Sequence, residues 1–306
     1  MRPFGFGRGA NGAAEGPPVP LEPRDLSRFS LSWSSSFNAR ELEQHLLTNP
    51  GLSWWVPGNQ EYLIGGPWRH RAEIVAIQEL SARQRTEELV GALVAHCRRQ
   101  GHRLVVMLDQ FETRQGGFYA RLGFDLLQHI IIYELPRIPR PIPAPHRLRF
   151  LPVTSALRPD LLAVDHAAFP WLWWNSGGEF DAYAALYGVE IYLAYEPGGA
   201  PVAYVGLTSY RGWGHLDRIA VIPERQGAGY GLETLHFAIA RLSDLGARRV
   251  GLSTQADNLR SQQLYERYGF RRTGGNDYTI YGVWLDDQSP SSEFKVQGST
   301  LPSAEH

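Results

Sequence analysis

Cysteine is almost absent from this 306-residue sequence, and so is any excess of one charge. The single Cys97 excludes an internal disulfide. Thirty basic and 31 acidic side chains leave a net charge of −1, so no overall field favours nucleic acid or an anionic membrane. No apolar run approaches the ~18 residues that a membrane-spanning helix needs. We therefore expect a soluble, cytoplasmic protein that acts on small molecules.

The length predicts two domains, each able to bury its own core. Residues 1–27 are rich in Gly and then Pro and lack the apolar region of a signal peptide, so we expect a flexible arm. Residues 138–146 predict a stiff, Pro-rich linker. Residues 288–306, rich in Ser, Pro, Gln and Glu, predict a disordered tail. The two predicted domains are residues 28–137 and 147–287.

The most informative stretch is residues 216–232, which predicts a strand, a tight turn and the start of a helix. The strand is apolar at most positions and ends at Pro223, which has no backbone donor. Three glycines follow between residues 227 and 231, and each can accept positive φ and bring bare backbone close to a ligand. Apolar residues then recur at helical spacing. Backbone N–H groups at such a helix N-terminus form an anion site suited to a pyrophosphate.

Three phosphate-binding motifs compete for this loop. A P-loop needs Lys-Ser or Lys-Thr after its last glycine, where this chain has Leu232-Glu233. A dinucleotide fingerprint needs GxGxxG and an acid about 20 residues later, and the strand near residues 250–253 ends without that acid. The loop instead matches QxxGxG, from Gln226 to Gly231. An ordinary strand-to-helix turn with three glycines is the alternative.

A second motif lies about 30 residues further on, from Asn258 to Phe270. Asp257 or Asn258 can cap a short helix there, and Gly269 can end it in the left-handed conformation. The segment is similar to NxxSxxLYExxGF. With QxxGxG before it, it resembles the GNAT superfamily of N-acetyltransferases. The resemblance implies an α/β fold with a mixed sheet.

The GNAT resemblance also implies acetyl-CoA as cosubstrate and no metal. Backbone groups of residues 219–221 would pair with the pantetheine amides, and the loop amides of residues 226–231 would hold the pyrophosphate. Arg225 or Arg260 would meet a phosphate, and Asn258 would lie beside the pantetheine. The predicted cofactor residues are therefore Ile219, Ala220, Val221, Arg225, Gln226, Gly227, Ala228, Gly229, Tyr230, Gly231 and Asn258.

Acyl transfer to an amine also needs proton transfers, and three side chains are candidates. The resemblance places Tyr265 near the thioester sulfur as the acid; the alternative is a packing tyrosine. His215 and Asp217 are two residues apart on one strand, so they share a face of the sheet. His215 falls where some GNAT members have a glutamate base, and an imidazole suits that role at neutral pH. The alternative is a structural polar pair, with the proton passing to water.

The order of predicted elements repeats within the chain. Residues 74–77 lie 145 positions before residues 219–222, and Phe118 to Phe124 lie 146 before Leu264 to Phe270. A tandem pair of GNAT-like units explains both offsets. At an offset of 145 the three glycines correspond to Ala82, Gln84 and Thr86, whose side chains fill the pyrophosphate position. We therefore expect the first unit to have lost the cofactor and to act as a structural partner.

Several expected elements of the first unit bear on this organisation. Ser36 is the predicted cap of a helix over residues 38–47. A second helix over residues 83–99 presents Cys97 on its apolar face, which predicts a buried core thiol rather than a nucleophile. Strands are expected over residues 103–108 and 128–135.

Three tryptophans occur within four positions: Trp171, Trp173 and Trp174. The GNAT resemblance suggests that they shape the acceptor pocket, and packing between the two units is an equal alternative. The predicted function is transfer of an acyl group from acetyl-CoA to an amine of a small molecule. The competing hypothesis is a catalytically silent acyl-CoA sensor, which would need the loop but not Tyr265.

Overall fold

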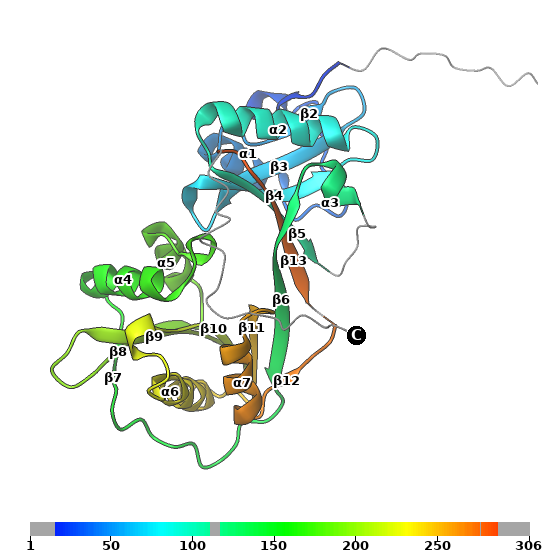
Figure 1. Cartoon of the computed structure of the whole chain (residues 1–306). Helices are drawn as coiled ribbons and strands as arrows, with labels where there is room; N and C mark the ends of the chain where they lie inside the picture. The colour runs from blue at the N-terminus through cyan, green and yellow to red at the C-terminus, as the bar shows by residue number, and fades with distance from the viewer. Residues whose placement is uncertain (1–15, 111–116, 276, 287–306) are drawn as a thin grey trace, which may run out of the picture.

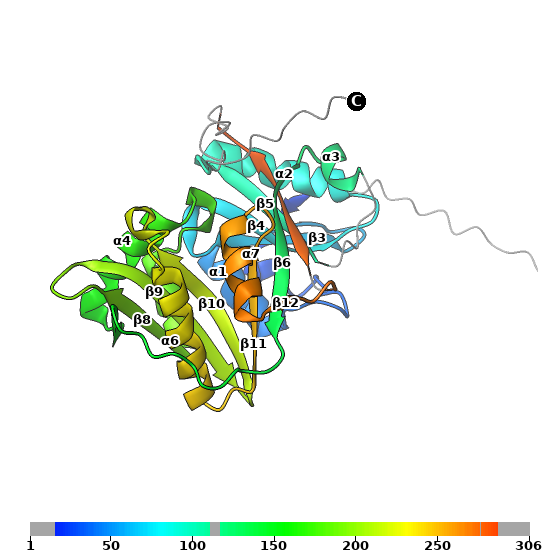
Figure 2. The same ribbon diagram turned by 60° about the horizontal axis from the view of Figure 1, so that its bottom comes forward.

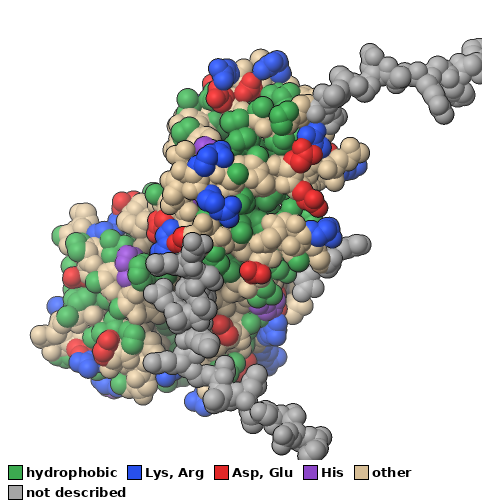
Figure 3. All heavy atoms as spheres, turned by 45° about the horizontal axis from the view of Figure 1, so that its top comes forward, with side chains coloured by type: hydrophobic (Ala, Val, Ile, Leu, Met, Phe, Trp, Pro, Cys, Tyr) green, Lys and Arg blue, Asp and Glu red, His purple; other side chains and the backbone are tan. Residues whose placement is uncertain are grey.

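The structure is a computed structural model that describes residues 16–110, 117–275 and 277–286. Figure 1 shows two units, one built mainly from the first half of the chain and one from the second. No helix in these ranges is long and apolar enough to cross a membrane. Charged side chains of both signs are interspersed over most of the face in Figure 3, in keeping with the balanced composition.

The first unit alternates strands and helices much as the apolar pattern predicts. Its elements are β1 (Val19–Pro20), η1 (Pro23–Asp25), α1 (Ala39–Thr48), β2 (Trp54–Val56), β3 (Glu61–Trp68), β4 (Arg71–Ser81), α2 (Thr86–Gln100), β5 (Leu104–Gln110), α3 (Phe118–Arg121) and β6 (Asp125–Leu135). Two glycines in the left-handed conformation border helices: Gly101 is the C-cap of α2, and Gly117 is the N-cap of α3. Cys97 is fully buried on α2, and burial raises the pKa of its thiol to about 12, as expected of a core residue.

The second unit begins after the Pro-rich linker. Its elements are β7 (Arg149–Pro152), η2 (Ser155–Leu157), α4 (Arg158–Ala168), η3 (Trp171–Trp173), α5 (Gly177–Ala184), β8 (Val189–Tyr195), β9 (Pro201–Tyr210), β10 (Trp213–Val221), η4 (Pro223–Arg225), α6 (Tyr230–Asp244), β11 (Arg249–Gln255), α7 (Leu259–Tyr268), β12 (Arg271–Arg272) and β13 (Tyr278–Trp284). Figure 2 shows α6 and α7 on one face of its strands, and α4 packs on the other face against β9 and β10.

Two strands are exchanged between the units. The sheet has 13 strands in the order β1-β2-β3-β4-β5-β13-β6-β11-β10-β9-β8-β7, with β12 beside β6. Strand β13, from the end of the chain, lies between β5 and β6 of the first unit. Strand β6, from the first half, pairs with β11 of the second unit. The predicted domain ranges 28–137 and 147–287 therefore separate two stretches of the chain, and both stretches contribute strands to one continuous sheet.

Two local predictions differ from the structure. Residues 16–27 of the predicted arm are packed, since β1 pairs with β2 and the Leu21 side chain is 2% exposed. Asn38, not Ser36, caps α1: its side chain accepts the N–H of Glu41 at 3.0 Å, and the Glu41 carboxylate accepts the Asn38 N–H at 2.9 Å. Ser36 instead donates to Glu79. The predicted tail and residues 1–15 lie outside the described residues.

The exchange of strands predicts that the two units unfold together. Ile280 of β13 is fully buried in a cluster that contains residues of both units. We expect Ile280→Ala to lower the free energy of unfolding by about 2–5 kcal/mol. Denaturant unfolding followed by tryptophan fluorescence and by circular dichroism should give one coincident transition.

The matched control is Leu186→Ala, because that side chain is 62% exposed and its loss should leave the midpoint unchanged. Two separate transitions in the Ile280→Ala variant, with only one of them shifted, would contradict the coupling.

Candidate active site

Strands β10 and β11 separate partway along their length. They pair in parallel from Trp213 beside Arg249 to Leu216 beside Leu252, but β10 continues to Val221 and β11 to Gln255. The pairing of β10 with β9 shifts at Asp217, which is a bulge. In the described chain no strand pairs with residues 217–221 on the β11 side. Backbone groups there are available to an extended, amide-containing ligand.

The glycine loop follows directly on this open strand. Gly227 and Gly229 have φ of 85° and 88°, and Gly229 is the N-cap of α6. Gly231 lies inside the helix and does not use positive φ, contrary to expectation. The Gln226 side chain donates to the Val221 carbonyl at 3.0 Å and closes the turn. The first-turn N–H groups of α6 have no intrahelical acceptor, so the loop ends in an anion site.

An arginine that the sequence analysis missed lies at this loop. The Arg147 guanidinium donates to the Ala228 carbonyl at 2.7 Å, and its Nη2 is 2.9 Å from where a Cβ on Gly229 would stand. Its Nε donates to Glu233 at 3.0 Å. The predicted phosphate ligands are engaged elsewhere: Arg225 pairs with Glu196 at 3.1 Å, and Arg260 donates to Gln226. No local motif marks Arg147, because it precedes the loop by about 80 residues.

Glu233 anchors Arg147 and the start of the second unit. One of its carboxylate oxygens accepts the backbone N–H groups of His146, Arg147 and Leu148 at 2.7–2.9 Å. Burial opposes its ionisation, but these bonds and Arg147 outweigh burial and hold the pKa of Glu233 below its usual value. The carboxylate therefore fixes the chain entering β7 against the first turn of α6.

His215 and Asp217 are brought together as the sequence predicts. His215 Nδ1 lies 2.8 Å from Asp217 Oδ1, and the other carboxylate oxygen accepts from Tyr183 at 2.6 Å and from Thr208 at 2.7 Å. Because an ionised carboxylate only accepts, Nδ1 is the ring nitrogen that donates to Asp217, and Nε2 is the other ring position. No described residue bonds to Nε2, and the His215 side chain is 39% exposed. Burial and the Asp217 charge raise the pKa of Tyr183, which stays a donor.

Tyr265 packs on the opposite face of the sheet, with its ring near Tyr133 of β6 and Phe270. Its side chain is 4% exposed in the cluster that contains Leu216, whose neighbour His215 points the other way. Burial raises the pKa of Tyr265 to about 12. The phenol therefore stays protonated but is a weaker acid than a free tyrosine. Asn258, predicted beside the pantetheine, caps α7 by accepting the N–H of Ser261 at 3.2 Å.

The tryptophan segment packs against the first unit. Trp171 lies over Arg71 and Arg103 at 4.3 and 4.7 Å, and Trp173 is 6% exposed in the cluster between the units. Trp174 stacks on His166 with ring centroids 4.5 Å apart. These contacts favour the interface alternative for Trp171 and Trp173. A contact of any of the three with an acceptor stays a prediction.

A buried polar network, not foreseen from the sequence, joins this segment to the β10 bulge. Asp165 is fully buried and accepts from Tyr204 at 2.5 Å, from the Asn175 N–H at 2.8 Å and from Arg218. Arg218 also donates to the Trp173 carbonyl at 3.0 Å. Because a buried ion pair is costly unless its remaining donors are satisfied, this network holds one geometry. It positions the strand that carries His215 and Asp217.

The first unit has the same strand separation but a shorter loop. Its pairing of β4 with β5 ends at Ile77 beside Met107, and its bulge is at Gln78. Seven positions separate Gln78 from Arg85, the N-cap of α2, whereas twelve separate Asp217 from Gly229. The strand repeat is therefore offset by 139, not 145, and the glycine loop is missing rather than substituted. The Glu61 carboxylate accepts the N–H groups of Gln84 and Arg85 at 2.8–3.2 Å, filling the anion position.

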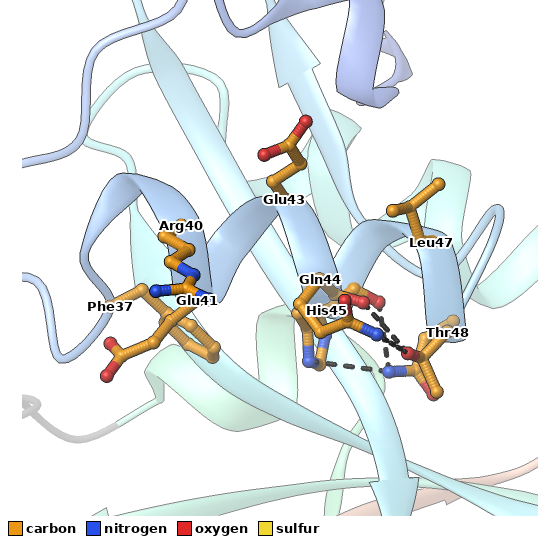
Figure 4. Close-up of a pocket in the computed structure, with 9 residues that line it drawn as sticks. Phe37, Arg40, Glu41, Glu43, Gln44, His45, Leu47 and Thr48 are labelled. Carbon is orange, nitrogen blue, oxygen red and sulfur yellow. Dashed lines mark hydrogen bonds between the residues drawn. The ribbon is translucent and has the colours of Figure 1, made fainter.

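A concave surface of about 630 Å³ on α1 is separate from this site (Figure 4). Its lining comes from residues 37–49 of the first unit alone, and Figure 4 draws these side chains along α1. None of the predicted site residues lines it. It carries no converging set of catalytic groups.

Comparison with protein families finds a similarity in the second unit. Residues 152–270 match the model of the acetyltransferase (GNAT) family. The matched residues lie within the second unit and include both of its motifs, so this unit is similar to the GNAT family. A search of curated proteins finds no match to this chain.

Solved structures extend the likeness to the whole chain. A GCN5-related N-acetyltransferase from Sphaerobacter thermophilus is 16% identical with a TM-score of 0.54, covering 88% of this chain and 95% of that chain. A tandem GNAT protein from the clavulanic acid biosynthesis pathway is 14% identical with a TM-score of 0.51, covering 88% and 98%. A probable N-acyltransferase from Enterococcus faecalis is 10% identical with a TM-score of 0.63, covering 89% and 72%. The predicted fold, two tandem GNAT-like units, is confirmed.

Proposed function

We propose that the second unit transfers the acetyl group of acetyl-CoA to an amine of a small-molecule acceptor. The observation that supports this most is the His215–Asp217 pair, which lies where β10 and β11 separate. A partly buried carboxylate that orients an imidazole is the arrangement of a general base. A base at the opening of a cofactor cleft has a use in catalysis and none in cofactor binding alone.

Each part of the site has a role in this reaction. Acetyl-CoA would supply an activated acetyl group held as a thioester. The loop N–H groups and Arg147 would hold its pyrophosphate, and the backbone of residues 219–221, on the side that β11 does not pair with, would hold the pantetheine. His215 Nε2 would take the proton of the acceptor ammonium on one face of the sheet. Tyr265 would give a proton to the departing sulfur on the other face.

One observation favours the alternative, a silent acyl-CoA sensor. The Tyr265 phenol has a pKa of about 12, whereas the reference value of a thiol is about 8.5. Proton transfer to the departing thiolate is therefore uphill by about 5 kcal/mol, more than for an unperturbed tyrosine. A sensor would bind acetyl-CoA at the same loop without turning it over.

Gly229→Glu tests the cofactor loop. The new carboxylate would stand at the pyrophosphate position, so we expect acetyl-CoA affinity to fall at least ~100-fold by calorimetry. Gly101→Glu is the matched control, because Gly101 has a similar φ of 79° and open space around it but lies on the first unit. Both variants lose stability through the positive φ, and Gly229→Glu must in addition displace the Arg147 guanidinium. Equal acetyl-CoA affinity in wild type and Gly229→Glu would refute the loop assignment.

His215→Gln tests the proposed reaction. With an acceptor found by screening amines for thiol release from acetyl-CoA, we expect kcat to fall ~10²–10³-fold while acetyl-CoA affinity stays within twofold. Asp217→Asn should act in the same direction, since it removes the charge that orients the ring. The control is His236→Gln, on α6 at the opposite face. An unchanged kcat in His215→Gln would show that His215 is not the base and that the amine loses its proton to water.

Tyr265→Phe separates the enzyme from the sensor. Removing the hydroxyl keeps the packed ring, so affinity should change little while kcat falls ~10-fold to 10²-fold. Because the pKa of Tyr265 is raised to about 12, the phenol keeps its proton at every assay pH below about 10. The pH profiles of wild type and variant should then have the same shape. Tyr119→Phe, at the equivalent place in the first unit, should not alter turnover.

Tight acetyl-CoA binding with no turnover of any amine would instead make the sensor the better description.

A further inference from the structure

The second unit carries an arginine-lined pocket at the end of β10 opposite the glycine loop. Its volume is about 560 Å³, and its lining is Pro136, Arg211, Gly212, Gly246, Arg248 and Arg249. We call it the arginine pocket. Three of the six lining residues are cations and none is acidic. The charge of this pocket therefore suits an anion.

The guanidinium groups of the arginine pocket are mostly unpaired. Arg249 lies over the Trp213 ring at 4.0 Å and is 3.8 Å from Glu134. Arg211 lies over the Tyr210 ring at 5.0 Å. Neither Arg211 nor Arg248 forms an ion pair with any residue in the described ranges. Planar guanidinium forks of this kind match the oxygens of carboxylates and phosphates.

Arg211 occupies a backbone position that arginine rarely adopts. It has φ of 48° and, with Gly212 at 80°, forms the two-residue turn between β9 and β10. Such turns favour Asn, Asp or Gly at the first position, and another L-residue there costs about 1–2 kcal/mol. The strain is consistent with a role for the arginine side chain that a better turn residue would not fill.

In the first unit, other residues of the chain contact the arginines at the equivalent end of the strands. There the β3–β4 turn and the start of β5 carry Arg69 and Arg103, and Arg103 is the counterpart of Arg248. Asp286 pairs with Arg103 at 2.9 Å, the Asn175 side-chain oxygen accepts from Arg69 at 2.7 Å, and Trp171 lies over Arg103. Acidic, carbonyl and aromatic groups thus cover this edge. At the same edge of the second unit the chain after β6 passes close by, with the Ile138 N–H donating to the Arg248 carbonyl at 3.3 Å, but no described acidic group pairs with Arg211 or Arg248.

The arginine pocket continues toward the catalytic base. The Trp213 and His215 rings both lie over Gly251, at 3.2 and 3.4 Å from its Cβ position. Gly251 is in register with His215 on one side and with Glu134 on the other. Gly251 therefore places no side chain of its own between those of His215 and Glu134. Arg249 contacts the Trp213 ring. Counted along the strand direction alone, the backbone of Arg249 is about 7 Å and that of Arg211 about 13 Å from the backbone of His215.

We propose that the arginine pocket binds an anionic group of the acceptor. The acceptor would be an amine whose phosphate or carboxylate lies about 7–13 Å from the reacting nitrogen. Arg211, Arg248 and Arg249 hold that anion, and the chain of the acceptor crosses the Trp213 ring to bring the amine to His215. This inference rests on the proposed function for its reaction. The arginine pocket itself does not depend on it.

The first test compares ω-amino alcohols of five to eight carbons with their phosphate esters and with ω-amino acids of equal length. We expect kcat/KM for at least one anionic series to exceed that of the alcohols at least tenfold, and the better series distinguishes phosphate from carboxylate. In Arg211→Gln/Arg248→Gln the ratio should fall to near one while kcat/KM for the alcohols is unchanged. Arg99→Gln, an exposed arginine on α2, is the matched control.

The second test needs no turnover. Calorimetry measures the affinity for inorganic pyrophosphate in the Gly229→Glu variant, in which the glycine loop no longer competes. We expect this affinity to fall at least tenfold when Arg211→Gln and Arg248→Gln are added.

The outcomes separate the two proposals. Equal turnover of alcohols, phosphates and acids by wild type would overturn the anionic acceptor and leave the acetyltransferase standing. If no amine is turned over, the proposed function fails, and the pyrophosphate measurement alone decides whether the arginine pocket binds anions. Pyrophosphate affinity unchanged by the arginine substitutions would overturn the pocket.

Discussion

The fold depends on a ladder of backbone hydrogen bonds between strands from opposite ends of the chain. β13 pairs with β5 along seven positions, and it pairs with β6, which in turn pairs with β11. Each unit therefore has a strand of the other within its own sheet. Because unpaired backbone donors in a sheet interior are costly, neither unit can leave this arrangement alone. The orientation of the first unit over the second follows from it.

That orientation has consequences at the interface. The β3–β4 turn of the first unit meets residues 171–175 of the second, where Trp171 and Trp173 pack against arginine side chains. Asp165 and Arg218 then link the tryptophan segment to the β10 bulge. The first unit, without a glycine loop, thus supports the strand that carries the proposed base.

The two units differ in what lies next to the backbone N–H groups at the start of α2 and α6. A helix that begins after a sheet strand leaves N–H groups without acceptors. In the first unit the Glu61 carboxylate accepts two of them, so the anion is part of the protein. In the second unit positive-φ glycines leave them bare, with Arg147 alongside. The difference makes one loop structural and the other suited to an external phosphate.

The sequence by itself determined the features that depend on residues close together in the chain. The glycine turn that opens α6, the end of α7 at Gly269 and the shared face of His215 and Asp217 follow from local backbone preferences, and the GNAT fold follows from two motifs about 30 residues apart. The site roles drawn from those motifs stay predictions. Only the tertiary structure decided the exchange of β6 and β13, the six-residue shift of the repeat and the place of Arg147. These depend on contacts between residues roughly 20 to 180 positions apart, whose energies arise only when folding brings the groups together.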